Sequence, residues 1–187
     1  MRYLINYYSP SPLTDSYRRS IVYLVLGFIL GYNKYMQITI HCDGGARGNP
    51  GHSAVGAVLK IENRKSKIEK ISKYIGIATN NQAEYQAIIE ALKWVREQYQ
   101  SNHLTSTSKV AGKVENLEIE CFLDSELIVE QLNQRYKIKN EGLKPLFWQV
   151  RELVMALGGK VSFKYIPREK NKEADRLVNE VLDKAPK

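Results

Sequence analysis

One stretch decides the fold, and it reads Asp43-Gly44-Gly45-Ala46-Arg47-Gly48-Asn49-Pro50-Gly51. The alternation of apolar and polar residues from Met36 to Cys42 predicts a strand that ends at Asp43. Four glycines and a proline in the next eight residues predict a tight loop with open backbone. Carboxylates at strand ends beside open backbone are typical of metal and phosphate sites. This stretch is therefore the first candidate for a functional site.

Working outward from this stretch, three more acidic residues lie at the start or end of a predicted element. Alternation predicts further strands over residues 53–61, 68–75, 117–123 and 161–166. A helix starts at the capping residues 79–81 and runs to about Tyr99, others cover the apolar positions 128–132 and 143–157, and a last one starts at Asn171. Glu84, Asp124 and Asp175 lie near these boundaries. Because strand ends and helix starts gather at one edge of such a sheet, we expect the four acids to meet.

The order of elements predicts a single α/β domain, a mixed sheet with helices packed on it, over residues 36–184. Residues 101–116 are polar and read as a surface insertion, and 185–187 form a tail. Residues 1–35 form an N-terminal extension with an apolar run of 12 residues at 21–32, short of the 18 expected of a membrane-spanning helix. Three interpretations stay open: a disordered or loosely packed tail, a membrane anchor, or a true start at Met36.

Charge and cysteine content narrow the partners and the compartment. The net charge of +8 favours a polyanionic partner such as nucleic acid, although a solvated basic surface explains it equally well. The two cysteines, Cys42 and Cys121, form neither a disulfide framework nor a zinc motif. If Asp43 and Asp124 are level on neighbouring strands, the two thiols are offset by two residues. This offset is too large for an easy disulfide, so we expect buried free thiols. Free thiols are typical of a reducing compartment, so we also expect a cytoplasmic location.

Four acidic residues in one place indicate metal chemistry. Clustered carboxylates repel one another, and a bound cation relieves that repulsion. A ligand set made only of oxygen selects Mg²⁺ or Mn²⁺ over zinc. Two such ions can activate a water and stabilise the leaving oxygen in phosphodiester cleavage.

Taken together, the short motifs of this chain resemble ribonuclease H, type 1, over residues 36–184. The resemblance implies a five-stranded mixed sheet in the order 3-2-1-4-5 with strand 2 antiparallel. Some details look most like the archaeal and related bacterial branch, which lacks a basic protrusion. The motifs that carry the resemblance are Asp43-Gly44-Gly45, Asn49-Pro50-Gly51, Thr79-Asn80-Asn81-Gln82-Ala83-Glu84, Asp124-Ser125-Glu126-Leu127, Ile166-Pro167-Arg168-Glu169 and Ala174-Asp175.

The resemblance implies an endonuclease that cuts the RNA strand of an RNA/DNA hybrid and leaves 5′-phosphate and 3′-hydroxyl ends. It implies two Mg²⁺ ions, with Mn²⁺ as a substitute. Asp43 would bridge both ions, Glu84 and Asp124 would complete the ion on the leaving-group side, and Asp175 would hold the ion on the water side.

The resemblance also indicates which residues contact the substrate. The family reads hybrids through the wide minor groove, where RNA displays its 2′-hydroxyls. The residues at the matching positions are Gly44, Asn49, Asn80, Gln82 and Ser125. Asn49 and Asn80 could instead be a turn residue and a helix cap with no other role.

The chain departs from many bacterial members in two places. Their mobile loop before the last acid carries a histidine that helps the product to leave. Here the loop over residues 167–172 has no histidine, and Arg168 is the candidate for this role in product release. A solvated basic loop is the alternative. The interval between Asp124 and Asp175 is too short for the basic helix and protruding loop that grip substrate in several members. We therefore expect weaker hybrid binding than in members that have the protrusion. The candidates for a partial substitute for the protrusion are Tyr136, Lys137, Lys139 and Lys144.

Other functions remain to be weighed against hybrid cleavage. One is a related nuclease that acts on double-stranded RNA or on a DNA junction. Another is a hybrid-binding module without catalysis, and a third is a protein tethered to a membrane by its extension. A monomer with no obligate protein partner is the default expectation, since nothing in the sequence decides the oligomeric state.

Overall fold

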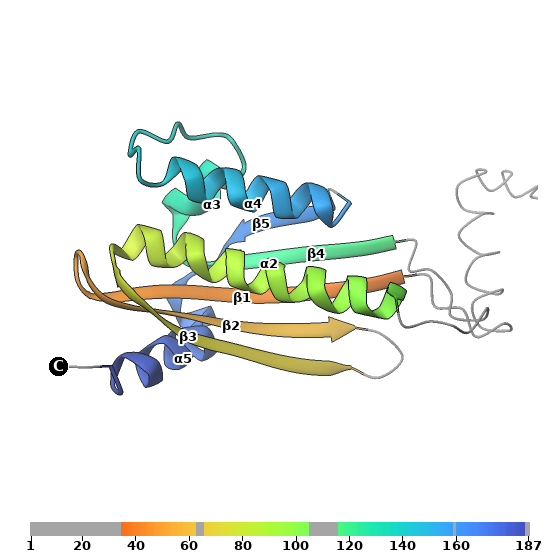
Figure 1. Cartoon of the computed structure of the whole chain (residues 1–187), viewed down its shortest axis with the longest axis horizontal. Coiled ribbons are helices and arrows are strands. Elements are labelled where there is room, and N and C mark those ends of the chain that lie inside the picture. Colours follow the sequence, from red (N-terminus) through yellow and green to blue (C-terminus); the bar gives the residue numbers. More distant parts are fainter. Residues whose placement is uncertain (1–34, 63–65, 105–115, 159, 186–187) are drawn as a thin grey trace, which may run out of the picture.

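The computed structural model describes residues 35–62, 66–104, 116–158 and 160–185 (Figure 1). Their strands are β1 (Tyr35–Gly48), β2 (Gly51–Glu62), β3 (Lys67–Ala78), β4 (Asn116–Leu123) and β5 (Val161–Tyr165). Their helices are α2 (Asn80–Leu104), α3 (Glu126–Leu132), α4 (Lys144–Ala156) and α5 (Lys172–Leu182), and a 3-10 turn, η1 (Arg168–Lys170), precedes α5.

The strands form one mixed sheet in the order β3-β2-β1-β4-β5. β2 is antiparallel to both β1 and β3, while β1, β4 and β5 run parallel. The sheet order and the antiparallel second strand predicted from the resemblance are therefore confirmed. Because β1 and β4 run parallel, Asp43 in β1 and Asp124 after β4 each lie two residues past the last pair between these strands, His41 and Phe122.

Helices cover the sheet on its two faces (Figure 1). On one face α2 packs against β1 and β2, and its buried Ile88 and Leu92 join Ile40, Leu59 and Ile119 of the sheet. On the other face α5 packs against the same two strands, where Ala54, Val178 and Leu182 form a second, smaller cluster. Each fully buried leucine or isoleucine stabilises the fold by about 1.5–3 kcal/mol, so burial holds both helices against β1.

The first strand continues past Asp43, contrary to the prediction of a tight loop there. β1 stays paired with β2 as far as Gly48 opposite Gly51, which leaves only Asn49 and Pro50 as the turn. The glycines serve a different purpose: a Cβ at Gly44 would lie 2.1 Å from the carbonyl carbon of Ala83, and one at Gly45 would lie 3.0 Å from Val178 Cγ1. They let α2 and α5 approach the strand from both faces.

The other boundaries differ from the predicted ones by a few residues. α2 continues to Leu104, so the first four residues of the predicted insertion at 101–116 belong to this helix. Residues 105–115 lie outside the described part, as do residues 1–34, 186 and 187, so the interpretations of the extension and of most of the tail are not tested. Among the described residues, no helix is long and apolar enough to cross a membrane.

Both cysteines are buried free thiols, as predicted. Ile40 lies opposite Cys121 in the register of β1 and β4, so Cys42 is offset from Cys121 by two residues. The expected offset of two residues between the cysteines is therefore confirmed.

Candidate active site

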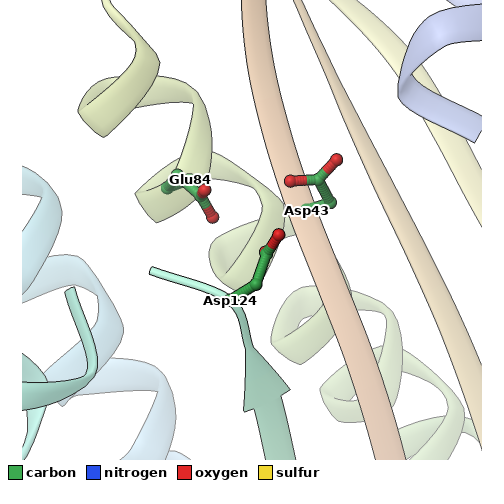
Figure 2. Close-up of side chains that lie close together, drawn as sticks. All are labelled: Asp43, Glu84 and Asp124. Carbon is green, nitrogen blue, oxygen red and sulfur yellow. The ribbon is translucent and has the colours of Figure 1, made fainter. Parts of the chain in front are cut away.

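Three of the four predicted acids meet at the edge of the sheet. Figure 2 shows the side chains of Asp43, Glu84 and Asp124 turned toward one another from β1, from α2 and from the residue after β4. One carboxylate oxygen of each residue lies within 4.8 Å of the corresponding oxygen of the other two. Asp43 is buried, and the other two residues are partly exposed. Carboxylates at this spacing form a candidate metal site.

Gly44 is the residue that makes this meeting possible. The missing side chain lets the first turns of α2 lie directly on the strand, which brings Glu84 to Asp43. The backbone of Gly44 lowers the pKa values of both carboxylates, against the larger effect of burial, which raises them. The structure places Gly44 against the backbone of Ala83 and Glu84, and its predicted contact with the substrate stays a prediction.

The electrostatics of the cluster fit a bound cation. Burial, followed by the charges of Asp124 and Asp175, raises the pKa of Asp43 to about 6. Burial and the charge of Asp43 raise the pKa of Glu84 well above its ordinary value. The buried Oε2 of Glu84 has no hydrogen-bond partner among the described residues. Carboxylate oxygens are the ligands that Mg²⁺ and Mn²⁺ prefer, so these residues fit a divalent ion.

The fourth acid, Asp175, lies next to this cluster rather than inside it. Its Oδ1 accepts a hydrogen bond from the guanidinium of Arg168, and its Oδ2 accepts one from Asn179 Nδ2 at 3.1 Å. Asp175 is nevertheless close enough to raise the pKa of Asp43. The pairing raises the pKa of Arg168, which keeps its positive charge beside the acids.

Asn171 is a residue of this site that sequence reasoning missed. The sequence predicts that Asn171 caps the last helix, but its side chain makes no capping bond. Its Nδ2 instead donates to the carbonyl oxygen of Cys42 at 2.8 Å and to Oδ1 of Asp124 at 2.9 Å. The only sequence signal for this role is that Asn171 lies four residues before Asp175. A helix cap explains the same position equally well.

The amides predicted to contact substrate form a small network between the β1–β2 turn and α2. Asn80 Oδ1 accepts from Ala46 N at 2.8 Å, and Asn49 Oδ1 accepts from Asn80 N at 3.1 Å. Gln82 Oε1 accepts from the backbone N–H of Thr79 at 2.9 Å. The bonds of Asn49 and Asn80 therefore join the turn to the start of α2, and only the bond between Gln82 and Thr79 is a local cap. Among the described residues, the NH₂ groups of the three amides have no acceptor. Ser125 precedes α3 without a side-chain capping bond.

A basic cavity of about 530 Å³ lies between the start of α2, α3 and the loop that leads to α4. Leu127 and Leu143 form its apolar part. Its polar lining includes Tyr136, Lys137 and Lys139, three of the four residues predicted as a partial substitute for the protrusion. The other polar residues of the lining are Asn81, Gln131, Arg135 and Asn140. Lys144, the fourth residue of the predicted substitute, pairs with Glu141 instead.

The metal-free protein is expected to lose stability as pH rises from about 4 to about 7. The pKa of Asp43 is raised from 3.8 to about 6 on folding, so the folded protein holds a proton that the unfolded chain releases. This contribution is fully present below the unfolded pKa and is lost as pH rises through the folded pKa. Asp43→Asn removes the titration and is expected to raise the free energy of unfolding at pH 7.5 by about 2–3 kcal/mol.

Urea unfolding in EDTA at pH 4 and pH 7.5 measures this difference. The gap between the variant and the wild type should be large at pH 7.5 and should nearly close at pH 4. Equal stability of the two proteins at pH 7.5 would mean that the carboxylate of Asp43 is not destabilised by its surroundings.

Comparison with known proteins places this arrangement among nucleases. The family model described as reverse transcriptase-like matches residues 41–181. The solved structure of LC11-RNase H1, isolated from compost, in complex with RNA/DNA hybrid is similar at 39% identity with a TM-score of 0.65, covering 79% of this chain and 97% of that one. The RNase H1 of the halophilic archaeon Halobacterium salinarum is similar at 33% identity with a TM-score of 0.64, covering 80% of this chain and 99% of that one.

A longer protein also contains a region similar to this chain. A bifunctional protein of Mycobacterium tuberculosis is 33% identical over 150 residues, which is 80% of this chain. The chain spans 36% of the length of that mycobacterial relative.

Proposed function

The chain belongs to the type 1 ribonuclease H family, and on that premise we propose that it is an endonuclease that hydrolyses the RNA strand of RNA/DNA hybrids. The observation that carries the proposal is the carboxylate cluster of Asp43, Glu84 and Asp124, whose oxygens lie within 4.8 Å of one another. The unpartnered Oε2 of Glu84 and the raised pKa of Asp43 support a role in holding a cation.

Two Mg²⁺ ions, with Mn²⁺ as a substitute, are the proposed cofactors. Asp43, Glu84 and Asp124 would hold one ion, and Asp175 together with Asp43 would hold the other. When bound, the ions would activate the attacking water and stabilise the leaving oxygen, which produces 5′-phosphate and 3′-hydroxyl ends.

Arg168 is proposed to handle the phosphate beside these acids. Its guanidinium contacts Asp175 while most of the side chain remains exposed. A permanent positive charge at this place attracts the substrate phosphate and helps to separate the product phosphate from the acids. This is the role that the sequence predicts for the loop that lacks histidine.

The amide network is proposed to read the RNA strand. The oxygens of Asn49 and Asn80 are held by backbone N–H groups, which fixes the orientation of both amides at the exposed rim beside the acids. Their NH₂ groups, with that of Gln82, are suited to donate to the 2′-hydroxyls and base edges of the wide minor groove. A network of this kind positions the RNA strand over the carboxylates.

The basic cavity is proposed to hold the other strand of the hybrid. Lys137 and Lys139 lie in its lining, and phosphate contacts by lysine give affinity that falls with salt. The double variant Lys137→Gln and Lys139→Gln is expected to raise KM for the hybrid several-fold with kcat nearly unchanged. The slope of log affinity against log salt concentration should become shallower by up to about 2.

Steady-state kinetics over a range of salt concentrations measures both effects. The matched control is Lys67→Gln, because Lys67 lies at the far end of β3 in an exposed pair with Glu69. A double variant with the KM and the salt slope of the control would exclude the cavity from substrate binding.

Double-stranded RNA is the second candidate substrate, because contacts to one set of 2′-hydroxyls are compatible with both duplexes. A substrate panel separates them: end-labelled hybrid, double-stranded RNA, single-stranded RNA and double-stranded DNA, each with Mg²⁺. We expect preferential cleavage of the RNA in the hybrid, with 5′-phosphate ends on the products. Hybrid binding without cleavage of any substrate would favour a non-catalytic module. A cytoplasmic location and a monomeric state stay predictions.

A further inference from the structure

We infer that Asn171 is a positioning residue for the divalent-ion site, and that it holds the carboxylate of Asp124 in register with Asp43. The inference rests on the proposed function, because it assigns Asn171 a part in metal binding by the same acids. Asn171 is not one of the proposed ligands, so its effect would pass through Asp124.

The contacts of Asn171 join three segments that meet at the site. Its side-chain amide donates to the Cys42 carbonyl, in the residue before Asp43, and to Asp124 Oδ1, directly after β4. Its own carbonyl accepts from the backbone N–H of Asp175 at 3.1 Å. One residue therefore links β1, the end of β4 and the first turn of α5, which carry three of the four acids.

These bonds lie just past the end of the ladder between β1 and β4, although β1 stays paired with β2 there. The pairing of β1 with β4 extends to His41 opposite Phe122. Asp43 and Asp124 lie beyond that last pair, so the ladder does not fix their separation. The amide of Asn171 bridges the two strands at this point and takes the place of the missing ladder bonds.

Only one orientation of the Asn171 amide satisfies both of its contacts. Asn171 is 1% exposed, and its Oδ1 has no hydrogen-bond partner among the described residues. A flipped amide would place an acceptor against two other oxygens, and both donors would be lost. The position therefore requires two N–H donors on one short side chain, which asparagine has and aspartate lacks. A donor bonded to a ligating carboxylate restricts its rotation and orients it for the ion.

Metal titration of the protein without substrate tests this inference. The Asn171→Ala variant is expected to bind Mn²⁺ about 10–100-fold more weakly than the wild type, measured by calorimetry on protein stripped with EDTA. In hybrid cleavage, kcat at a fixed low Mg²⁺ concentration should fall while KM for the hybrid stays unchanged. Excess Mg²⁺ should restore part of the rate, which a loss of folded structure alone would not produce.

The matched control is Asn133→Ala. Asn133 Nδ2 donates to the carbonyl oxygen of Phe163 at 3.0 Å, so this variant also removes a side-chain bond that joins two segments, but away from the acids. We expect both variants to melt at a lower temperature and only the Asn171 variant to bind Mn²⁺ more weakly. If Asn171→Ala does not fold, Asn171→Ser keeps one hydroxyl donor and should show a smaller loss in the same direction.

The outcomes separate this inference from the proposed function. A wild type that binds no Mn²⁺ while folded would overturn the metal site itself. A wild type that binds Mn²⁺, together with folded Asn171 variants of equal affinity, would overturn only the role of Asn171. An equal loss of Mn²⁺ affinity in Asn133→Ala would show that any lost bond of this kind loosens the site, and it would also overturn the inference.

Discussion

Asp43→Asn is expected to reduce cleavage of an RNA/DNA hybrid by more than about a thousandfold, the scale seen when a central catalytic group is removed. Asp43 is the most buried of the three clustered acids and lies beside both Glu84 and Asp124. Asparagine keeps the size of the side chain and removes the charge that a divalent ion would neutralise. Binding of the hybrid should change little, because the amide network and the basic cavity remain intact.

Asp183→Asn is the matched control for this experiment. It makes the same chemical change at an exposed aspartate that pairs with Arg47 on the surface. Its activity should stay within about twofold of the wild type, since exposed ion pairs contribute little. The asparagine variant at position 43 should remain folded and more stable than the wild type in EDTA. A folded Asp43→Asn protein with more than a tenth of wild-type activity would remove Asp43 from the mechanism.

Gly44→Ala is expected to have the largest effect on stability, a loss of about 3 kcal/mol or more, since overpacking of a rigid contact costs at least this order. An added Cβ would lie 2.1 Å from Ala83 C and 2.3 Å from Glu84 N. Both atoms belong to the backbone of α2, so no side chain can rotate away. The helix must move off the strand, which also carries Glu84 away from Asp43. Thermal unfolding and activity should therefore fall together.

Gly142→Ala provides the comparison. The same methyl group there would meet Asn140 Oδ1 at 3.2 Å and Gln82 Nε2 at 3.5 Å, and both are ends of flexible side chains. This variant should unfold within about 1 kcal/mol of the wild type, as substitutions away from tight contacts usually do. If Gly44→Ala were as stable as Gly142→Ala, α2 could not lie as close to β1 at Gly44 as the structure shows.

The positions of the strands could be predicted from the sequence because their signal is local, whereas the order of the strands was implied by the family resemblance. Alternation of apolar and polar residues in β4 matches its alternating burial, whereas β2 is buried on both faces over residues 53–59 and carries a nearly continuous apolar run. The extension of β1 beyond Asp43 could not be predicted in the same way. Gly44 and Gly45 look like turn residues, and only the two helices that approach them show why side chains are absent. The end of α2 was missed because residues 100–104 carry no apolar stripe.

The site was predictable in part. Four acids at the ends of elements indicated a metal cluster, and three of them meet as expected. The pairing of Asp175 with Arg168 and the bonds of Asn171 depend on side chains that converge from distant segments. No sequence period reports such contacts. An asparagine at the start of a helix has a local explanation, capping, and the structure replaces it with a tertiary one.

Cleavage of the labelled RNA strand of an RNA/DNA hybrid by the wild-type protein, in Mg²⁺ and in EDTA, tests the central claim most directly. We predict endonucleolytic products in Mg²⁺ and none in EDTA, with activity restored when Mg²⁺ is added back. Absence of cleavage in both Mg²⁺ and Mn²⁺ by the folded protein, or cleavage that persists in EDTA, would contradict the assignment of the carboxylate cluster as a metal-dependent nuclease site.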